Sequence, residues 1–418
     1  MPLKVDADDA TVVSSRSRES GSVIRLGMST VLSGDAERLG RDVRFGIRLA
    51  LHEHASNPIG QRPTVTHAFE ERRDRIGVEE TFGRYRLLCL DDGYEPSRTV
   101  VNLRRLTGPF KADAIVGNVG TPTVVAALPI LNETGTPLIG PFTGAALLRT
   151  DPPNPLVFNL RAGYDAEIRT IIDGLVEAGI RPQEIACLTQ KDGYGDAGFG
   201  GAAKALARHG VPDWRTIGHG RYDRNSVNVE GALADLILHE PLPRAVLIAG
   251  AYRPAARAIR VARKRGFDPV FCNVSFVGSE ALLESLGEHG DGVVVTQVVP
   301  PPWSTCPAAT AFRDALRRFA PKRNATFATF EGYLVGRMVV AGTSTLSGNI
   351  DPLRVRKALE DLGQFDLGIG TPLSFNPLRH HASERVWGTV IQNRRMIDFG
   401  FDFRPLVRQT HSAQLGSR

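Results

Sequence analysis

The chain has 418 residues, of which 42% are hydrophobic and 23% charged, and its 51 Lys and Arg exceed its 45 Asp and Glu. This length predicts two domains, since a domain usually spans about 100–200 residues, and the composition is that of a globular protein rather than a disordered or fibrous one. The basic residues are dispersed among acidic ones, so the net charge of +6 does not indicate nucleic acid as a partner. No run of about 18 apolar residues occurs, which excludes a transmembrane helix.

The two ends of the chain and one internal segment differ from the rest. The chain begins MPLKVDADDATVVSSRSRES, which is polar throughout and lacks the apolar core of a secretory signal. We predict flexible tails at 1–21 and 406–418. Residues 55–84 carry prolines and many charges between a predicted helix and a predicted strand, which indicates a surface insertion.

From residue 23 onward, short β-branched runs alternate with longer helical patterns. The predicted strands are 23–29, 85–91, 114–119, 136–141, 184–190, 245–251, 269–275 and 292–299. The predicted helices include 39–55, 122–135, 165–179, 198–210 and 254–266, of which the last four end in the glycines that commonly close a helix. Because the strands are apolar on both faces, this alternation predicts an α/β fold with parallel sheets, and the number of units requires two sheets.

The four cysteines are far apart in the sequence. Cys89, Cys187 and Cys272 lie inside apolar runs, and Cys306 does not. We interpret them as buried strand thiols rather than as a disulfide or metal framework. No Cys or His cluster with metal-ligand spacing is present, so no metal is expected.

One glycine-rich string has the spacing of a dinucleotide-binding loop. Gly193, Gly195 and Gly198 follow a predicted strand and precede a helix. However, Gln190, Lys191 and Asp192 separate the apolar part of the strand from the first glycine, and no acidic residue ends the next strand-like segment. We therefore interpret this string as a loop that opens a helix, and we keep a nucleotide-dependent enzyme as the third hypothesis.

No motif unites a nucleophile, a base and an oxyanion donor. His380 and His381 fall in a loop-like stretch and are expected to be solvated. Asp91 and Asp92 follow a strand and are expected to cap the helix that begins near Pro96. The sequence therefore favours a binding protein over an enzyme, and no cofactor is expected.

Two loops have the chemistry of an anion site. Thr121 and Thr123 follow one strand at the start of a helix, and Thr143 and Gly144 follow the next strand. Hydroxyls and unpaired N–H groups at such strand ends hold a carboxylate well. The alternative is that Thr121 and Thr143 only cap their helices.

The same residues belong to a longer series of matching segments: IRLGMSTVLSGDAERLGRDVRFGIRLAL, LDDGYEPSRTVVNLRRL, GNVGTPT, PLIGPFTGAALLR, KDGYGDAG and NVSFVGSEAL. In these segments the chain resembles the type I periplasmic solute-binding proteins of the branched-chain amino acid (Leu/Ile/Val-binding) class, which serve ABC importers. The resemblance extends from about Val23 to Ile397, with the segments in the family's order.

The resemblance implies two Rossmann-like lobes with parallel sheets, joined by three crossover strands. By position, the first lobe takes 22–161 and 298–375, with the insertion at 55–84, and the second takes 162–297 and 376–405. The crossovers fall near 159–162, 297–300 and 375–377. No catalysis is implied: contacts made only when the lobes close shift an open–closed equilibrium, and a partner recognises the closed form.

The resemblance also implies ligand contacts from the first lobe. Thr121 stands where the family uses a Ser that holds the ligand's α-carboxylate. Phe142, Thr143 and Gly144 form the second contacting loop, where a Thr is usual at the position of Gly144. Thr143 can replace that Thr from one residue earlier.

From the other lobe, Tyr194 and Tyr252 match aromatic residues that contact the ligand. Leu39, within the range of the first lobe, stands where some members have an aromatic side chain that forms a wall of the site. Ser275 departs from the family, because leucine-type binders have a Glu there that pairs with the ligand's α-ammonium. A buried ammonium without an anionic partner is costly by several kcal/mol, so an amine-free carboxylate, an aromatic acid or an amide is favoured. The alternative is that Asp92 or Glu331 replaces the missing Glu.

We therefore expect the substrate-binding protein of an ABC importer, with a small carboxylate-containing solute as ligand and membrane permease subunits as partners. Its location is periplasmic if a signal peptide is missing from this sequence, and otherwise cytoplasmic. The alternative is a cytoplasmic amide- or acid-sensing regulator on the same fold. An apolar leader encoded upstream of Met1 would distinguish the two.

Overall fold

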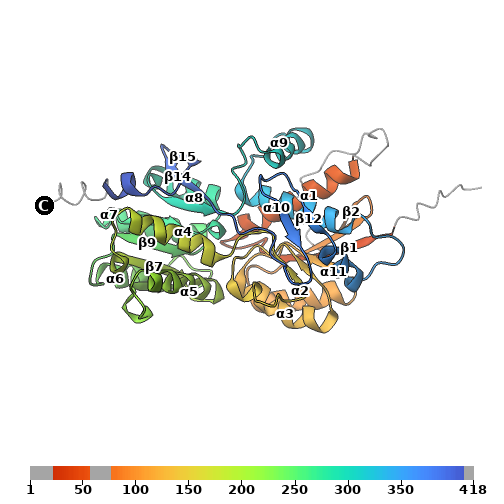
Figure 1. Cartoon of the computed structure of the whole chain (residues 1–418), viewed down its shortest axis with the longest axis horizontal. Coiled ribbons are helices and arrows are strands. Elements are labelled where there is room, and N and C mark those ends of the chain that lie inside the picture. The colour runs from red at the N-terminus through yellow and green to blue at the C-terminus, as the bar shows by residue number, and fades with distance from the viewer. Residues whose placement is uncertain (1–21, 57–76, 409–418) are drawn as a thin grey trace, which may run out of the picture.

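The computed structural model describes residues 22–56 and 77–408, which form two lobes that lie side by side (Figure 1). Each lobe is built around its own sheet, and helices cover both sheets. The two described ends of the chain lie in different lobes, residue 22 in the first and residue 408 in the second. The predicted α/β fold with two sheets is confirmed.

The first lobe has a six-stranded sheet in the order β2-β3-β1-β4-β5-β6. Its strands are β1 (Ile24–Thr30), β2 (Glu79–Phe82), β3 (Tyr85–Asp91), β4 (Ala114–Val116), β5 (Leu138–Ile139) and β6 (Val157–Phe158). All neighbouring strands pair in parallel except β2, which forms an antiparallel hairpin with β3. Its helices are α1 (Glu37–Ser56), α2 (Pro96–Thr107) and α3 (Thr121–Thr134), followed late in the chain by α9 (Pro307–Phe319), α10 (Phe327–Thr343) and α11 (Pro352–Glu360).

Helices cover both faces of this sheet. Along β3, Leu88 and Leu90 pack into the core under α2 and α3, whereas Leu87 and Cys89 pack into the core under α1 and α10. This alternation follows from the two-residue period of a strand. It explains why both faces of the strand are apolar in sequence.

The late helix α10 packs closely on α1. A Cβ atom at Gly46 of α1 would lie 2.0 Å from the carbonyl oxygen of Thr329, and one at Gly332 of α10 would lie 2.3 Å from that of Val43. Only glycine allows two helix backbones to approach so closely. This contact holds the late helices in the first lobe.

The second lobe has a seven-stranded sheet in the order β15-β14-β11-β10-β9-β7-β8. Its strands are β7 (Ile185–Gln190), β8 (His219–Tyr222), β9 (Ala245–Ala249), β10 (Val270–Asn273), β11 (Val294–Gln297), β14 (Trp387–Gln392) and β15 (Arg395–Asp398). Its helices are α4 (Tyr164–Glu177), α5 (Gly193–Arg208), α6 (Glu230–Ile237), α7 (Tyr252–Lys264) and α8 (Ser279–Leu286). The last two strands, β14 and β15, are antiparallel and come from the end of the chain.

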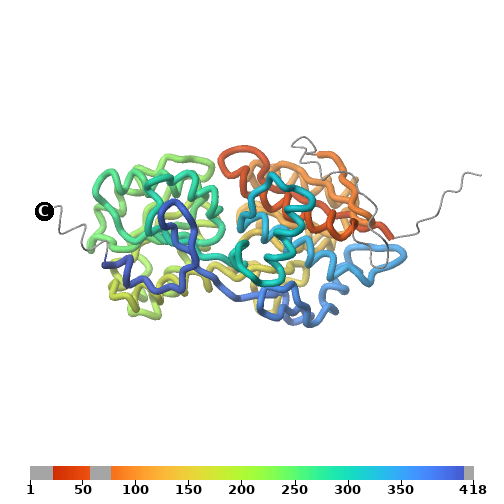
Figure 2. Tube along the Cα trace, turned by 90° about the horizontal axis from the view of Figure 1, so that it is seen from above, coloured from red at the N-terminus to blue at the C-terminus, as the bar shows by residue number. Residues whose placement is uncertain are grey.

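The chain passes between the lobes three times: after β6, after β11, and after a small hairpin of β12 (Gly363–Phe365) and β13 (Leu373–Phe375). Figure 2 shows these passages close together, with the last one in blue. A hinge made of three neighbouring strands lets two rigid lobes rotate against each other.

Most local predictions are confirmed. Four predicted helix ends have a glycine with positive φ, at Gly135, Gly179, Gly210 and Gly266. Cys89, Cys187 and Cys272 are free and buried in strands, and Cys306 is free and partly exposed just before α9.

Two surface predictions need correction or lie partly outside the described residues. Of the predicted insertion at 55–84, residues 57–76 are not described, but Glu80 and Phe82 of its final strand are buried. Of the predicted tail at 406–418, residues 406–408 belong to a helical turn in which Val407 is buried, so the tail prediction is wrong there. The predicted tail at 1–21 and residues 409–418 lie outside the described ranges.

Candidate ligand-binding cleft

The loops after β4 and β5 meet at one edge of the first sheet. The hydroxyl oxygens of Thr121 and Thr143 lie 2.7 Å apart in a hydrogen bond, and both residues are fully buried. They meet because β4 and β5 are parallel neighbours, so their carboxyl ends face the same edge. The N-cap of α3 is Gly120, not a threonine side chain, so helix capping by Thr121 is wrong.

The neighbouring Gly144 is placed by a close contact with Tyr164. A Cβ atom at Gly144 would lie 2.5 Å from Cδ1 of Tyr164, and the backbone N–H of Tyr164 donates to the carbonyl oxygen of Gly144 (2.7 Å). The threonine that the family usually has there would collide with the ring. Thr143 therefore presents the only hydroxyl of these two positions.

The second lobe contributes Tyr194 at the start of α5. Its ring packs on Phe276 with centroids 4.5 Å apart, and Phe276 in turn lies 5.7 Å from Phe142 of the first lobe. Phe276 belongs to the short turn Ser275–Val277, directly after β10. The structure thus brings Phe142 and Tyr194 together through a residue that joins the two lobes.

Tyr252 and Leu39 meet elsewhere on the lobe interface. Both are buried, and a Cβ atom at Gly278 would lie 2.7 Å from Leu39 and 3.6 Å from Tyr252. Within residues 22–56 and 77–408, no ring contact joins Tyr252 to the rings of Phe142, Tyr194 and Phe276. These two predicted positions therefore close the interface beside the central rings.

Three further tyrosines were not recognised from the sequence: Tyr94, Tyr164 and Tyr222. The ring of Tyr94 lies 6.2 Å from Phe276, and that of Tyr164 lies 5.3 Å from Tyr194. Burial raises the pKa of each, and the charge of Asp192 adds to the effect at Tyr94 and Tyr222. The signal that could have found them is position, because each follows or ends a strand at the carboxyl edge of a sheet.

The hydroxyl groups of Tyr164, Tyr194 and Tyr222 are buried and have no hydrogen-bond partner among the described residues. A buried hydroxyl without a partner costs about 1–3 kcal/mol. Tyr94 differs, because its hydroxyl oxygen lies 3.5 Å from the Gln190 amide nitrogen, which donates to it. All three unpaired hydroxyls belong to the second lobe, and a polar ligand would supply the partners that they lack.

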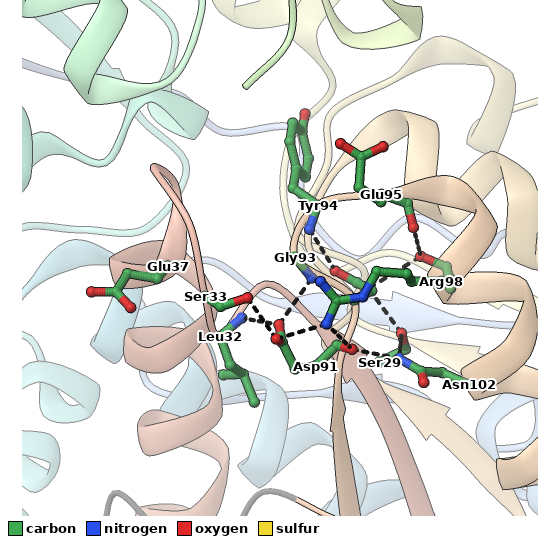
Figure 3. A network of polar contacts seen from close by, with 12 residues as sticks. Ser29, Leu32, Ser33, Glu37, Asp91, Gly93, Tyr94, Glu95, Arg98 and Asn102 are labelled. Carbon is green, nitrogen blue, oxygen red and sulfur yellow. Dashed lines mark hydrogen bonds and ion pairs between the residues drawn. The ribbon is translucent and has the colours of Figure 1, made fainter. Parts of the chain in front are cut away.

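Tyr94 is held in place by the loops that follow β1 and β3 (Figure 3). Asp92 accepts hydrogen bonds from the Ser29 hydroxyl (2.8 Å) and the Tyr94 backbone N–H (3.0 Å), while Asp91 accepts from the Ser33 hydroxyl (2.6 Å) and the Leu32 N–H (2.8 Å). Figure 3 shows the Tyr94 ring pointing away from this network. The network orders the first-lobe wall of the cleft.

The prediction that these aspartates cap α2 is wrong. The N-cap is Glu95, without a side-chain hydrogen bond, although the helix does begin at Pro96. Burial raises the pKa of Asp92 to about 6. Asp92 is occupied by its own partners and does not replace the missing Glu.

A buried ionic group forms the floor of the cleft. Arg161, in the first crossover, is fully buried and pairs with Glu331 of α10, with Nε 2.9 Å from Oε1. Its Nη2 donates to the Ser275 hydroxyl (2.9 Å), and its guanidinium carbon lies 4.3 Å from the centre of the Phe142 ring. Arg161 was not recognised from the sequence, because its partners come from both lobes.

Ser275 joins this group to a second carboxylate. Its N–H and hydroxyl donate to Glu167 of α4 at 2.8 and 3.1 Å, and the Thr296 hydroxyl donates to the same carboxylate at 2.6 Å. Glu331, the acid suggested as a replacement, does lie in the cleft floor. However, Arg161 already neutralises Glu331, and Glu167 is held by three donors.

The dinucleotide interpretation meets a physical obstacle. Asp192 caps α5 and accepts hydrogen bonds from the N–H groups of Tyr194 (2.9 Å) and Gly195 (3.2 Å). These are the donors that a pyrophosphate needs. A Cβ atom at Gly195 would lie 1.8 Å from the Gln190 carbonyl oxygen, so this glycine serves close packing.

The prediction for His380 is wrong, and that for His381 holds only in part. His380 is 1% exposed and stacks on Phe158 with ring centroids 4.2 Å apart, while its Nδ1 lies 3.0 Å from the Asn154 carbonyl oxygen. His381 is partly exposed, and burial lowers its pKa to about 4. Burial lowers the pKa of His380 as well.

Within 22–56 and 77–408, no three His, Cys, Asp or Glu side chains group as a metal site. No helix in these ranges has the length and apolar content needed to cross a bilayer.

Comparisons with known proteins agree with this geometry. The family model for periplasmic binding proteins matches residues 23–395. A possible leucine/isoleucine/valine-binding protein from Rhodopirellula baltica SH 1 is 42% identical; the match covers 94% of this chain and 99% of that chain, with a TM-score of 0.84. A substrate-binding periplasmic protein from Ralstonia solanacearum is 26% identical over 90% of this chain and 100% of its own, with a TM-score of 0.77.

A more distant structure shares the fold. This solute-binding protein of an ABC transporter from R. palustris, in complex with benzoate, is 18% identical; the match covers 91% of this chain and 96% of that one, with a TM-score of 0.73. Among curated proteins, no sequence matches the chain.

Proposed function

Because the chain belongs to the periplasmic binding protein family, which binds solutes and is not enzymatic, we propose that it captures a small amine-free carboxylate for an ABC importer. The ligand lies between the two lobes, against the threonine pair Thr121 and Thr143 and the ring of Tyr194. Its partners are the membrane permease subunits of the importer, and its place of action is the periplasm.

The observation that carries this proposal is an excess of unpaired buried donors over free carboxylates. The hydroxyls of Tyr164 and Tyr194 and the Nη1 of Arg161 have no hydrogen-bond partner among the described residues. The nearby carboxylates of Glu167 and Glu331 are already bound by donors of the protein. A ligand carboxylate supplies the acceptors that these donors lack.

An α-amino acid fits this chemistry less well. Its ammonium would need Glu331, but the Arg161 cation already occupies that carboxylate and would repel the ligand's charge. Separating a buried pair costs about 3–5 kcal/mol. The similar protein from Rhodopirellula baltica is described as a possible leucine/isoleucine/valine-binding protein, so leucine is the natural competitor.

Closure is the functional step in this proposal. Phe142 and Phe276 come from opposite lobes, and their rings meet only when the lobes are together. A ligand that contacts both walls binds the closed form better and shifts the population towards it. The permease then recognises the closed arrangement.

The test compares leucine with 4-methylpentanoate, which is the same molecule without the ammonium group. Isothermal calorimetry should give 4-methylpentanoate, benzoate or phenylacetate a Kd at least about tenfold lower than that of leucine, a difference of about 1.4 kcal/mol. Tighter binding of leucine would overturn the choice of ligand. Binding of none of these would overturn the proposed ligand class.

A variant pair tests the place of binding. Thr121→Val keeps the side-chain shape and removes the hydroxyl, so it should weaken the bound carboxylate by about tenfold or more. Thr107→Val is the matched control, since that hydroxyl bonds only to the Leu103 carbonyl within α2. If Thr121→Val and Thr107→Val bound the carboxylate with equal affinity, the ligand would not bind at Thr121.

A further inference from the structure

A second pocket, with a volume of about 340 Å³, opens beside the crossovers. Its walls come from three parts of the chain: the first-lobe loop that contains Gly144 and Arg149, the helices α4 and α5 of the second lobe, and the crossover segment 381–384. Thr121 and Tyr194 do not line it. The pocket is therefore distinct from the candidate cleft and shares with it only Gly144 of the predicted contact residues.

The second-lobe wall is strongly basic. Arg169 of α4 and Lys204 and Arg208 of α5 line the pocket. Lys204 and Arg208 are four positions apart, so they lie on the same face of α5, and α4 packs alongside α5. Lys204 pairs with Asp165 at 2.9 Å, whereas Arg169 and Arg208 have no ion pair within the described ranges.

Arg149 forms the inner wall and also carries an uncompensated charge. Its guanidinium donates to three backbone carbonyls, those of Ala145 (3.1 Å), Thr143 (3.3 Å) and Arg161 (3.1 Å). No carboxylate among the described residues lies within ion-pair distance of it. Burial, together with repulsion from Arg161, lowers the pKa of Arg149 to about 10.

The charges in this pocket do not balance. Beyond the Lys204–Asp165 pair, three arginines line it against one acid, Glu384, which is exposed. Arg169 and Arg208 are exposed to solvent at this cavity, and like charges that line one cavity raise the local concentration of anions and bind them with charge-assisted hydrogen bonds. Arginine also binds oxyanions in two-pronged geometry.

We propose that this pocket is a second binding site, which takes a small polyvalent oxyanion such as phosphate or a dicarboxylate. The pocket is complete only when both lobes and the third crossover are in contact, so the anion binds the closed form. Arg149 links the two sites, because it binds the carbonyls of Thr143 and Arg161 in the cleft. If the proposed function holds, the anion and the cleft ligand increase each other's affinity by the same factor.

The first experiment needs no cleft ligand, so it is independent of the proposed function. The full chain is titrated with inorganic phosphate and with succinate by calorimetry, against sodium chloride of matched ionic strength. We expect saturable binding of phosphate, succinate or both that chloride does not reproduce. The variant Arg169→Gln/Arg208→Gln should weaken that binding at least about tenfold.

The control variant is Arg105→Gln/Arg260→Gln, which removes the same charge from exposed arginines on α2 and α7. It should bind like the wild type. Equal weakening in both double variants, or a response that chloride reproduces, would show only general charge attraction and would overturn the proposal. Loss of phosphate binding in Thr121→Val would also overturn it, by placing the anion in the cleft.

The coupling has its own readout. The Kd of the cleft carboxylate should fall about threefold or more when phosphate saturates the wild type, and should not change in Arg169→Gln/Arg208→Gln. Phosphate binding without any change in the carboxylate's Kd would overturn the proposed coupling but would still support the second binding site. Phosphate binding in the absence of any carboxylate binding would contradict the proposed function alone.

Discussion

Arg161 and Glu331 join the first crossover to the long helix α10 through an ion pair in which both side chains are buried, 0% and 5% exposed. The Ser275 hydroxyl of the second lobe accepts a third bond from the same guanidinium. One arginine therefore connects the hinge, the first lobe and the second lobe. Because Arg161 is fully buried, loss of its anionic partner would leave its charge uncompensated away from water.

We expect Glu331→Gln to lower the free energy of unfolding by about 3–5 kcal/mol, because it leaves the Arg161 charge buried without its anion. Urea denaturation measures this change. The matched control is Asp314→Asn, which breaks the exposed pair with Arg317 and should cost no more than about 1 kcal/mol. A loss of the same small size in both variants would contradict the role of the buried pair.

Tyr194→Phe separates the ring from the hydroxyl. The ring contact with Phe276 remains, while a buried hydroxyl without a partner is removed. We expect the ligand-free protein to gain about 1 kcal/mol of stability and the ligand complex to lose about 1–2 kcal/mol of binding free energy. Thermal unfolding and calorimetry measure the two effects. A variant that is less stable and binds normally would show that the hydroxyl is structural.

Glu280 makes stability depend on pH. Its carboxylate accepts from the Phe327 backbone N–H (2.8 Å) across the lobe interface, and burial raises its pKa from 4.5 to about 7. The folded state favours the protonated form, so this contribution is complete below about pH 4.5 and is lost as the pH rises through about 7.

Glu280→Gln should therefore flatten the pH profile of the unfolding free energy. Between about pH 5 and about pH 8, the wild type should lose roughly 2 kcal/mol more than the variant, with partial exposure of the carboxyl taken into account. Denaturant titrations at the two pH values give this difference. Parallel profiles of the wild type and the variant would exclude Glu280 as the titrating group.

Ion pairs at the rim connect the lobes. Arg224 of the second lobe lies 2.7 Å from Glu95 of the first, and both side chains are partly exposed. Arg224→Gln should raise the ligand's Kd by about two- to fivefold at low salt and by less at high salt. Arg104→Gln, which breaks an exposed pair with Glu133 within the first lobe, should leave the Kd unchanged at both salt concentrations.

The Asp192 cap provides a test against nucleotide binding. Asp192→Ala should cost about 1 kcal/mol of stability, because two N–H donors of α5 lose their acceptor. Neither the wild type nor the variant should show a higher melting temperature with NAD. A clearly higher melting temperature of the wild type with NAD would support the hypothesis of a nucleotide-dependent enzyme instead.

The inner parallel strands of both sheets are predictable because they are short apolar runs that alternate with helical patterns, whereas the parallel edge strands 157–158 and 219–222 were not predicted. The antiparallel edge strands are not predictable either. Residues 79–82 alternate between exposed and buried, residues 395–398 are largely exposed, and neither segment shows an apolar run, so their pairing depends on the neighbouring strand. His380 is misjudged for a similar reason, since its partner Phe158 is distant in sequence.

In the candidate cleft, too, some residues are predictable from the sequence and others are not. Thr121 and Thr143 are predictable because adjacent strand ends bring them together. Arg161 and Tyr164 are not, since their partners come from both lobes and only tertiary packing reveals them. The sequence also cannot explain why position 144 is a glycine, because the Tyr164 ring that occupies the space of a larger side chain is 20 residues away.

The position of β14 and β15 bears on how the chain acquires its structure. These strands complete the second sheet only at residue 398, and the first lobe likewise needs α9 to α11. During synthesis, the first lobe cannot complete its core before residue 360 is made, and the second lobe cannot complete its sheet before residue 398. A product that stopped before residue 387 would leave the edge of β11 open to other chains, so incomplete copies are expected to aggregate rather than to bind solute.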